Sequence, residues 1–262
     1  MTDDVRPCIR KVVAMKVIVN ADDFGVNENC TLEICKAFRL GLLSQTTTMV
    51  NMPWFEKGAS LAKEYGFFNN VGLHFNLTEG SPLTREMSEC DFFCDGNGEF
   101  SGKFHLSLKT RLMLPHSLIA VLQNEAKAQI ERYLDAGYTM KHLDSHHHVH
   151  TDFSIASVLL PMVEKYGFKT CRISRTLSSN GMGIAKKIYK VAYNRYLRQY
   201  LKPLSDEMTD FADFKILEES LPGDVSVEIM VHPGNRLEYD MQEQLAFWTK
   251  AADKGLEVFH SV

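Results

Sequence analysis

The stretch Met15-Lys16-Val17-Ile18-Val19-Asn20-Ala21-Asp22-Asp23-Phe24-Gly25 joins a short apolar run to a group of polar residues. A β-branched run of this length is typical of a strand buried on both faces of a sheet. The polar residues follow directly where such a strand would end, and residues 28–40, closed by Gly41, have the pattern of a helix. The stretch therefore predicts one unit of strand, polar loop and helix.

The same order recurs along the chain. Strands are expected at residues 46–50, 71–77, 140–144, 170–174, 225–231 and 256–260, and helices at 117–136, 154–166 and 241–252. About seven strands alternating with helices predict a parallel α/β architecture, either barrel-like or an open sheet. Active sites in both arrangements lie at the carboxyl ends of the strands.

Two regions depart from this alternation. Residues 79–116 are rich in glycine, proline and aromatic residues, and residues 178–220 contain a basic helix that we expect to be a solvated face. We expect a single domain over residues 15–262, with these two regions as insertions. Residues 1–14 are expected to be an N-terminal extension.

The composition is that of an ordinary globular protein, with 45% hydrophobic and 24% charged residues among 262. A net charge of −4 provides no overall basic field to attract nucleic acid or an anionic membrane. No apolar run approaches the ~20 residues that cross a bilayer, and the first residues lack the pattern of a secretory signal. The six cysteines form no C-x-x-C pair and are expected to be reduced thiols. The sequence thus predicts a cytoplasmic protein that binds neither nucleic acid nor membrane.

The run His142-Leu143-Asp144-Ser145-His146-His147-His148-Val149-His150 places five of the ten histidines within nine residues. If the run is extended, one face carries His142, Asp144, His146, His148 and His150. Imidazole binds divalent zinc, copper, iron or nickel, and a carboxylate can ligate the ion or orient a histidine. The alternative is a surface patch of histidines, which the interior position and the apolar flanking residues disfavour.

Three other predicted strands also carry polar residues at their ends. His74 and Asn76 share one face of residues 71–77, and the strand at 225–231 leads directly into His232. Arg172, in the strand at 170–174, needs an acidic partner if it is buried. Asp22 or a substrate group could be that partner, and an ordinary surface salt bridge is the other interpretation. Together with Asp22 and Asp23, these residues predict a metal site built from aspartate and histidine.

Four motifs in this order resemble the YdjC-like family of carbohydrate deacetylases: residues 20–25, 72–78, 142–150 and 231–234. The resemblance implies a distorted (β/α) barrel related to the NodB-type polysaccharide deacetylases. It also implies a divalent metal, Mg²⁺ first with Zn²⁺ as the alternative, held by Asp23, His74 and His146. Asp22 is the base in this family pattern. Strand parity alone allows His148 as well as His146 to be the ligand.

The implied reaction removes the N-acetyl group from an amino sugar or a chitooligosaccharide-type substrate. Asp22 would take a proton from water, and His232, arriving from another strand, is the candidate acid for the departing amine. The residues expected to bind the substrate are Arg172, Asp144, His148 and Asn76. The expected partner is therefore a small N-acetylated sugar, and a homodimer is left open.

Two other functions remain open from the sequence. The same metal site could hydrolyse another amide or a phosphate ester, which the basic helix would favour. The chain could also bind a metal through its histidines without catalysing a reaction.

Overall fold

The structure, a computed structural model, describes residues 15–253, 256 and 258–259. Its strands are β1 (Lys16–Phe24), β2 (Gln45–Thr48), β3 (Val71–Phe75), β4 (His142–Ser145), β5 (Thr170–Cys171), β6 (Lys202–Pro203), β7 (Glu207–Asp210) and β8 (Ser226–Val231). Its helices are α1 (Glu28–Arg39), α2 (Phe55–Glu64), α3 (Arg85–Ser88), α4 (Leu108–Leu112), α5 (Ile119–Asp135), α6 (Phe153–Lys165), α7 (Ile184–Leu197), α8 (Phe211–Leu217) and α9 (Met241–Asp253). Within the described residues, none of these helices combines the length and the apolar character needed to cross a bilayer.

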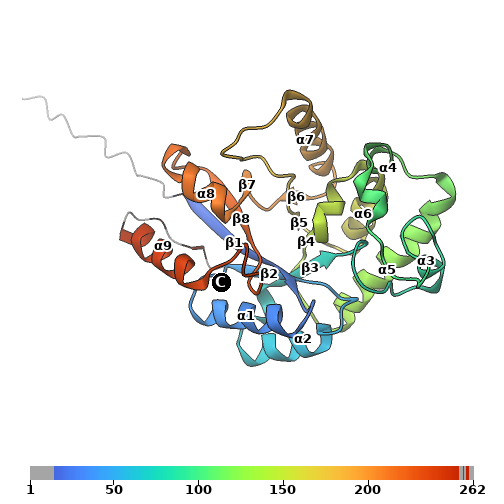
Figure 1. Cartoon of the computed structure of the whole chain (residues 1–262), viewed down its shortest axis with the longest axis horizontal. Helices are drawn as coiled ribbons and strands as arrows, with labels where there is room; N and C mark the ends of the chain where they lie inside the picture. Colours follow the sequence, from blue (N-terminus) through green and yellow to red (C-terminus); the bar gives the residue numbers. More distant parts are fainter. Residues whose placement is uncertain (1–14, 254–255, 257, 260–262) are drawn as a thin grey trace, which may run out of the picture.

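The strands form one parallel sheet in the order β6-β5-β4-β3-β2-β1-β8-β7, and the helices lie around its outside (Figure 1). The parallel α/β class is confirmed. The sheet has eight strands where about seven were expected. No pairing joins β6 to β7 in the part of the chain that the structure describes, so the sheet is an open half-barrel.

The two additional strands, β6 and β7, both lie in the region at 178–220 that was expected to be an insertion. Lys202-Pro203 is a two-residue strand with a proline, and Glu207–Asp210 is mostly polar. Neither has the apolar run that identifies a buried strand in a sequence. The predicted extension at residues 1–14 lies outside the described residues, as does part of the predicted strand at 256–260, of which Val258 forms a parallel bridge with Val17.

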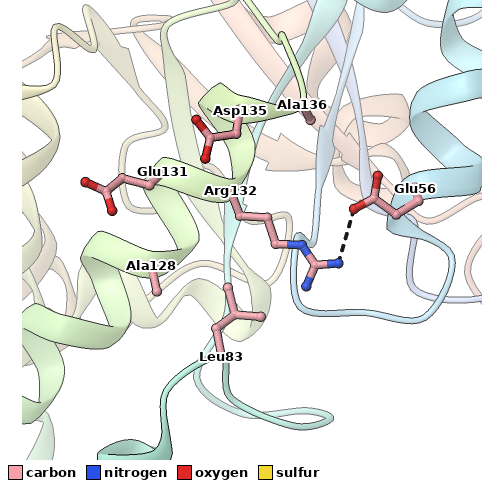
Figure 2. Close-up of a pocket in the computed structure, with 7 residues that line it drawn as sticks. All are labelled: Glu56, Leu83, Ala128, Glu131, Arg132, Asp135 and Ala136. Atoms are coloured by element: carbon pink, nitrogen blue, oxygen red, sulfur yellow. Dashed lines mark hydrogen bonds and ion pairs between the residues drawn. The ribbon is translucent and has the colours of Figure 1, made fainter.

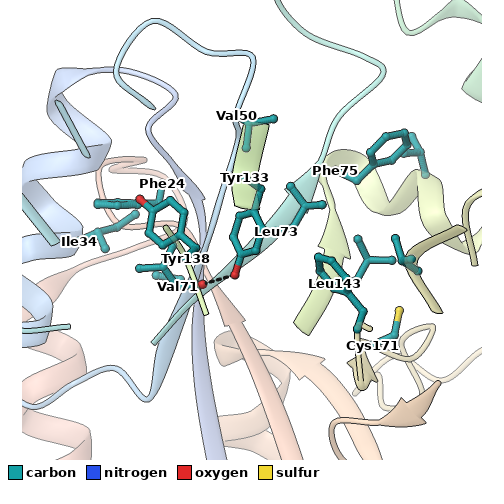
Figure 3. Close-up of a cluster of buried hydrophobic side chains, with 14 of the residues drawn as sticks. Phe24, Ile34, Val50, Val71, Leu73, Phe75, Tyr133, Tyr138, Leu143 and Cys171 are labelled. Atoms are coloured by element: carbon teal, nitrogen blue, oxygen red, sulfur yellow. Dashed lines mark hydrogen bonds between the residues drawn. The ribbon is translucent and has the colours of Figure 1, made fainter. Parts of the chain in front are cut away.

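The packing of the hydrophobic core determines which side chains of β3 point away from the core. Val71, Leu73 and Phe75 are fully buried and pack in the cluster with Leu143 of β4 (Figure 3). Tyr133 of α5 donates a hydrogen bond to the carbonyl oxygen of Val71 at 2.7 Å, which ties the helix to the strand. Because side chains alternate along a strand, this packing turns the intervening residues to the opposite face.

That opposite face carries Gly72 and His74. A side chain at position 72 would meet the carbonyl oxygen of His142 at 3.1 Å, so glycine permits the close approach of β4 to β3. The close approach brings the carboxyl ends of these strands, with their polar residues, next to each other.

Candidate metal centre

Asp23, His74 and His146 converge from the ends of β1, β3 and β4. The Oδ1 atom of Asp23 lies 2.7 Å from Nδ1 of His146 and 3.1 Å from Nε2 of His74. Two ligands bonded at ~2.1 Å to one ion and at right angles to each other lie about 3.0 Å apart. The two separations are close to that spacing, the three atoms all lie within 4.8 Å of one another, and two imidazoles with one carboxylate are a suitable donor set.

The electrostatics of these three residues favour a positive charge between them. Burial lowers the pKa of His74, but the carboxylates of Asp144 and Asp23 outweigh it and raise the pKa to about 10. His146 is also affected by burial, yet Asp23 and Glu79 raise its pKa to about 9. Burial raises the pKa of Asp23, but the two histidines hold it well below its usual range. A metal ion would compete with the protons on these imidazoles.

The ring of His74 is held in place from its other nitrogen. Nδ1 of His74 lies 2.7 Å from Oδ1 of Asp144 and 3.1 Å from the hydroxyl of Thr47. Asp144 is fully buried, and the hydroxyl of Thr47 donates to its second oxygen at 2.9 Å. A carboxylate on the far nitrogen of a ligating histidine orients the ring and leaves Nε2 for the metal.

His146 has a corresponding carboxylate that the sequence analysis missed. Nε2 of His146 lies 3.0 Å from Oε2 of Glu79, in an ion pair. The side chain of Asn76 accepts hydrogen bonds from the backbone nitrogens of Thr78 and Glu79 at 3.0 and 3.2 Å. Asn76 thus shapes the turn that presents Glu79. Glu79 follows closely after the end of the strand that carries His74, and this position is the feature of the sequence that could have identified it.

Side chains in the histidine run do not alternate between two faces as they would in an extended strand, because the backbone changes conformation there. The described residues other than glycine with positive φ are Asp23 at 66°, His147 at 50° and His148 at 56°, and all three border the site. The strand expected at 140–144 is present as β4, which ends at Ser145, and the run is not extended beyond it, because residues 146–151 form a 3-10 segment. Such strained residues are concentrated at functional sites.

The altered path separates His146 from the other histidines of the run. The ring of His148 lies near His150, with ring centroids 6.4 Å apart, rather than beside Asp23. His142 and His150 are fully buried, and burial lowers their pKa values to about 4 and about 3. Of the histidines in the run, the structure brings His146 to Asp23.

Asp22 lies beside this centre and forms an ion pair with Arg172. Arg172 is fully buried and donates to both oxygens of Asp22, at 2.6 and 2.7 Å. The same guanidinium lies 2.9 Å from Asp144 and donates to Glu228 at 2.6 Å. Burial lowers the pKa of Arg172, but the three carboxylates raise it well above its usual range. The acidic partner expected for a buried arginine is thus Asp22, together with two others.

His232 lies next to this group but outside it. It follows β8 directly, and β8 pairs with β1 so that Val231 is opposite Ala21. The register therefore places His232 at the level of Asp22 on the neighbouring strand. Nδ1 of His232 lies 2.8 Å from Oε2 of Glu238, and the ring is one quarter exposed.

A separate groove of about 470 Å³ between α2 and α5 contains none of the predicted site residues (Figure 2). Arg132 and Glu56 form an ion pair of 3.3 Å across it. The polar centre at the strand ends is therefore the stronger candidate for a functional site.

Comparison with known proteins agrees with the motifs at the strand ends. The family model described as YdjC-like protein matches residues 16–261. The chain belongs to this family. The YdjC-like match spans every residue of the centre and of the Arg172 network.

Among the curated relatives, a carbohydrate deacetylase of Brevibacillus brevis is 39% identical over 153 residues, which are 58% of this chain and 57% of that protein. A carbohydrate deacetylase of Clostridium beijerinckii is 30% identical over 220 residues, or 84% of this chain and 82% of the relative. The matched region of this YdjC-like chain thus spans only 57% of the length of the Brevibacillus protein.

A crystal structure from Enterococcus faecalis V583, named as a candidate cellobiose-phosphate cleavage protein, has the same fold. Its TM-score is 0.68 at 23% identity, covering 94% of this chain and 97% of the other. The similarity supports the architecture of the YdjC-like chain over nearly its whole length.

Glu79 can be tested through metal affinity. Removing a carboxylate that orients a ligating histidine typically weakens metal binding by about 10- to 100-fold. We expect Glu79→Ala to weaken binding by about 10-fold, and Glu79→Gln, which keeps an acceptor, to weaken it less. Calorimetric titration with Zn²⁺ and Mg²⁺ measures both, and Glu89→Ala, an exposed acid paired with Arg85, is the matched control. Unchanged affinity in Glu79→Ala would show that Glu79 does not orient His146.

Glu228 can be tested through the pH dependence of stability. It is fully buried, and burial raises its pKa from 4.5 to about 7. Between these values the unfolded chain releases this proton more readily than the folded one, so stability falls as pH rises. Glu228→Gln cannot ionise and does not lose this stability. The free energy of unfolding of the variant minus that of the wild type should therefore be larger at pH 8 than at pH 5, by up to about 3 kcal/mol. Urea denaturation at both pH values measures this difference, and an equal difference at both would contradict the assignment.

Proposed function

We propose that the chain is a metal-dependent hydrolase that removes the N-acetyl group from an acetylated amino sugar or a chitooligosaccharide-type substrate. The convergence of Asp23, His74 and His146 beside a second carboxylate, Asp22, is the observation that carries the proposal. The relatives named carbohydrate deacetylase support the sugar as substrate.

The three converging residues would hold the divalent ion, with Mg²⁺ expected from the family resemblance. Two nitrogen donors among three also suit Zn²⁺. When bound, the ion supplies a Lewis acid for the acetyl oxygen and lowers the pKa of water. Asp144 and Glu79 act as positioning residues for the two histidines.

Asp22 would accept the proton of the attacking water. Its Oδ1 accepts hydrogen bonds from Arg172 and Asn20, at 2.7 Å each, whereas Oδ2 accepts one, from Arg172. A carboxylate oxygen has two lone-pair sites, so Oδ2 keeps one for the proton. In this proposal Arg172 and Asp144 position other groups instead of touching the substrate, because both are fully buried.

His232 would protonate the departing amine. Glu238 lies against its Nδ1, which leaves Nε2 as the atom that holds the transferable proton. An imidazole can carry and release a proton near neutral pH, and a carboxylate on its other nitrogen fixes its orientation. In this proposal the base for the attacking water, Asp22, and the acid for the leaving amine, His232, lie at the ends of the neighbouring strands β1 and β8.

The adjacent aspartates provide a matched pair of variants. Asp22→Asn should retain the metal and lose about 10²- to 10⁴-fold in kcat, because a base is removed. Asp23→Asn should lose the metal. Metal content and acetate release from N-acetylglucosamine oligomers measure both properties. The opposite result, with metal lost in Asp22→Asn and kept in Asp23→Asn, would exchange the two roles.

His232→Ala tests the acid through the leaving group. An amine departs poorly unless it is protonated, whereas an activated aryl acetate ester needs no such help. The variant should therefore lose far more kcat on an N-acetyl sugar than on the ester. Equal losses would give His232 another role, such as orienting Asp22, and lost stability with an unchanged ratio would make it structural.

Metal binding without turnover on any amide or ester would instead favour a non-catalytic metal-binding protein. Turnover of phosphate esters without acetate release would favour the other hydrolase.

A further inference from the structure

If the proposed function holds, the two atoms of the cleaved bond determine the direction in which the substrate lies on the site. The acetyl carbon must face the centre formed from β1, β3 and β4, and the sugar nitrogen must face His232. In the sheet, β8 lies on the opposite side of β1 from β3 and β4, and β7 lies beyond it. The body of the sugar must therefore extend across β8 toward β7.

A pocket of about 570 Å³ lies at that end of the sheet. It is formed by the carboxyl ends of β7 and β8, the first turn of α8 and residues 236–240, and His232 is part of its lining. The volume is within the range of small-molecule sites, ~300–1,000 Å³. Phe211 and Val231, which are 5% and 3% exposed, supply part of its apolar lining.

The charged groups around the pocket are mostly paired with each other. His232 pairs with Glu238, and Lys215 pairs with Glu243. Arg236 is exposed, and in the described part of the chain it is the cationic lining residue that makes no ion pair. Its guanidinium offers five N–H donors in a rigid planar arrangement.

The balance of charge indicates the kind of ligand. Three of the four lining carboxylates are in ion pairs: Asp210 with Arg175, Glu238 with His232, and Glu243 with Lys215. In the described part of the chain, Asp240 and Arg236 are the lining charges that form no ion pair, so one acceptor group and one donor group remain for a ligand. A neutral sugar presents hydroxyl groups that both donate and accept hydrogen bonds, as well as an apolar C–H face, and this combination fits the mixed lining.

We propose that this pocket binds the sugar body of the substrate, on the amine side of the cleaved bond, and that Arg236 binds its hydroxyl groups. His232 then stands between the pocket and the metal centre, next to the nitrogen that must leave.

Two variants of the pocket test the proposal. Arg236→Met removes the guanidinium and keeps most of the apolar stem, and Ala212→Trp fills the pocket from the exposed start of α8. For each, kcat/KM is measured on an N-acetylglucosamine trimer and on an aryl acetate ester, which has no sugar body. The ratio of the first to the second should fall about 10-fold or more, as when a hydrogen bond to a charged group is lost. Thermal unfolding of each variant verifies that it is folded.

Direct binding gives a second readout. Calorimetric titration of the trimer into Asp22→Asn should show binding that Arg236→Met weakens in the same background. Arg198→Met, an exposed arginine at the end of α7 near the opposite edge of the sheet, should leave the ratio unchanged.

If the wild type releases acetate from the trimer but both pocket variants keep its ratio, the pocket assignment is overturned and the proposed function stands. If the wild type neither deacetylates nor binds the trimer, both are overturned.

Discussion

The buried guanidinium of Arg172 makes four contacts to three carboxylates, and the arrangement of the site depends on them. Through Asp22, Asp144 and Glu228 it connects β1, β4 and β8 at one level of the sheet. Burying charges costs several kcal/mol per ion, and replacing such networks with apolar residues is often neutral or stabilising. We therefore interpret the network as a device for positioning. It holds the carboxylate of Asp22 in place, and through Asp144 it fixes the ring of His74.

The negative charges of this network exceed the charge of Arg172, and a positive charge at His74 in the candidate metal centre would balance them. One guanidinium faces three carboxylates, and burial raises the pKa of Glu228 to about 7. With Glu228 protonated, the charges of Asp22 and Asp144 are offset by Arg172 and by a positive charge at His74. A proton supplies that charge on the free imidazole, and a metal ion would take its place. Metal binding at the candidate centre would therefore be coupled through His74 to the state of the buried network.

Much of the fold could be predicted because its main strands are apolar runs followed by polar residues. Residues 15–19 gave the start of β1, and the pattern at 71–77 assigned His74 to the face opposite the core. The edge strands β6 and β7 could not be predicted, since strands of two and four residues without an apolar run leave no periodic signal. At the site, residue types and strand ends suggested Asp22, Asp23 and His74.

The remaining details depend on backbone geometry that residue types do not reveal. Positive φ at His147 and His148 ends the alternation of the histidine run, and no glycine marks these positions. Glu79 reaches His146 from a turn that the side chain of Asn76 stabilises.

The central claim is that Asp23, His74 and His146 form one metal site. Anomalous diffraction from crystals of the wild-type protein soaked in Zn²⁺ or Mn²⁺ tests it most directly. The account predicts one strong peak bounded by Oδ1 of Asp23, Nε2 of His74 and Nδ1 of His146. Two other groups of potential ligands in the described residues, both buried, provide the contrast: Asp22, His74 and Asp144, and His142, Asp144 and Glu228. A peak at either of those groups instead, or no peak between Asp23, His74 and His146 at saturating metal, would contradict the account.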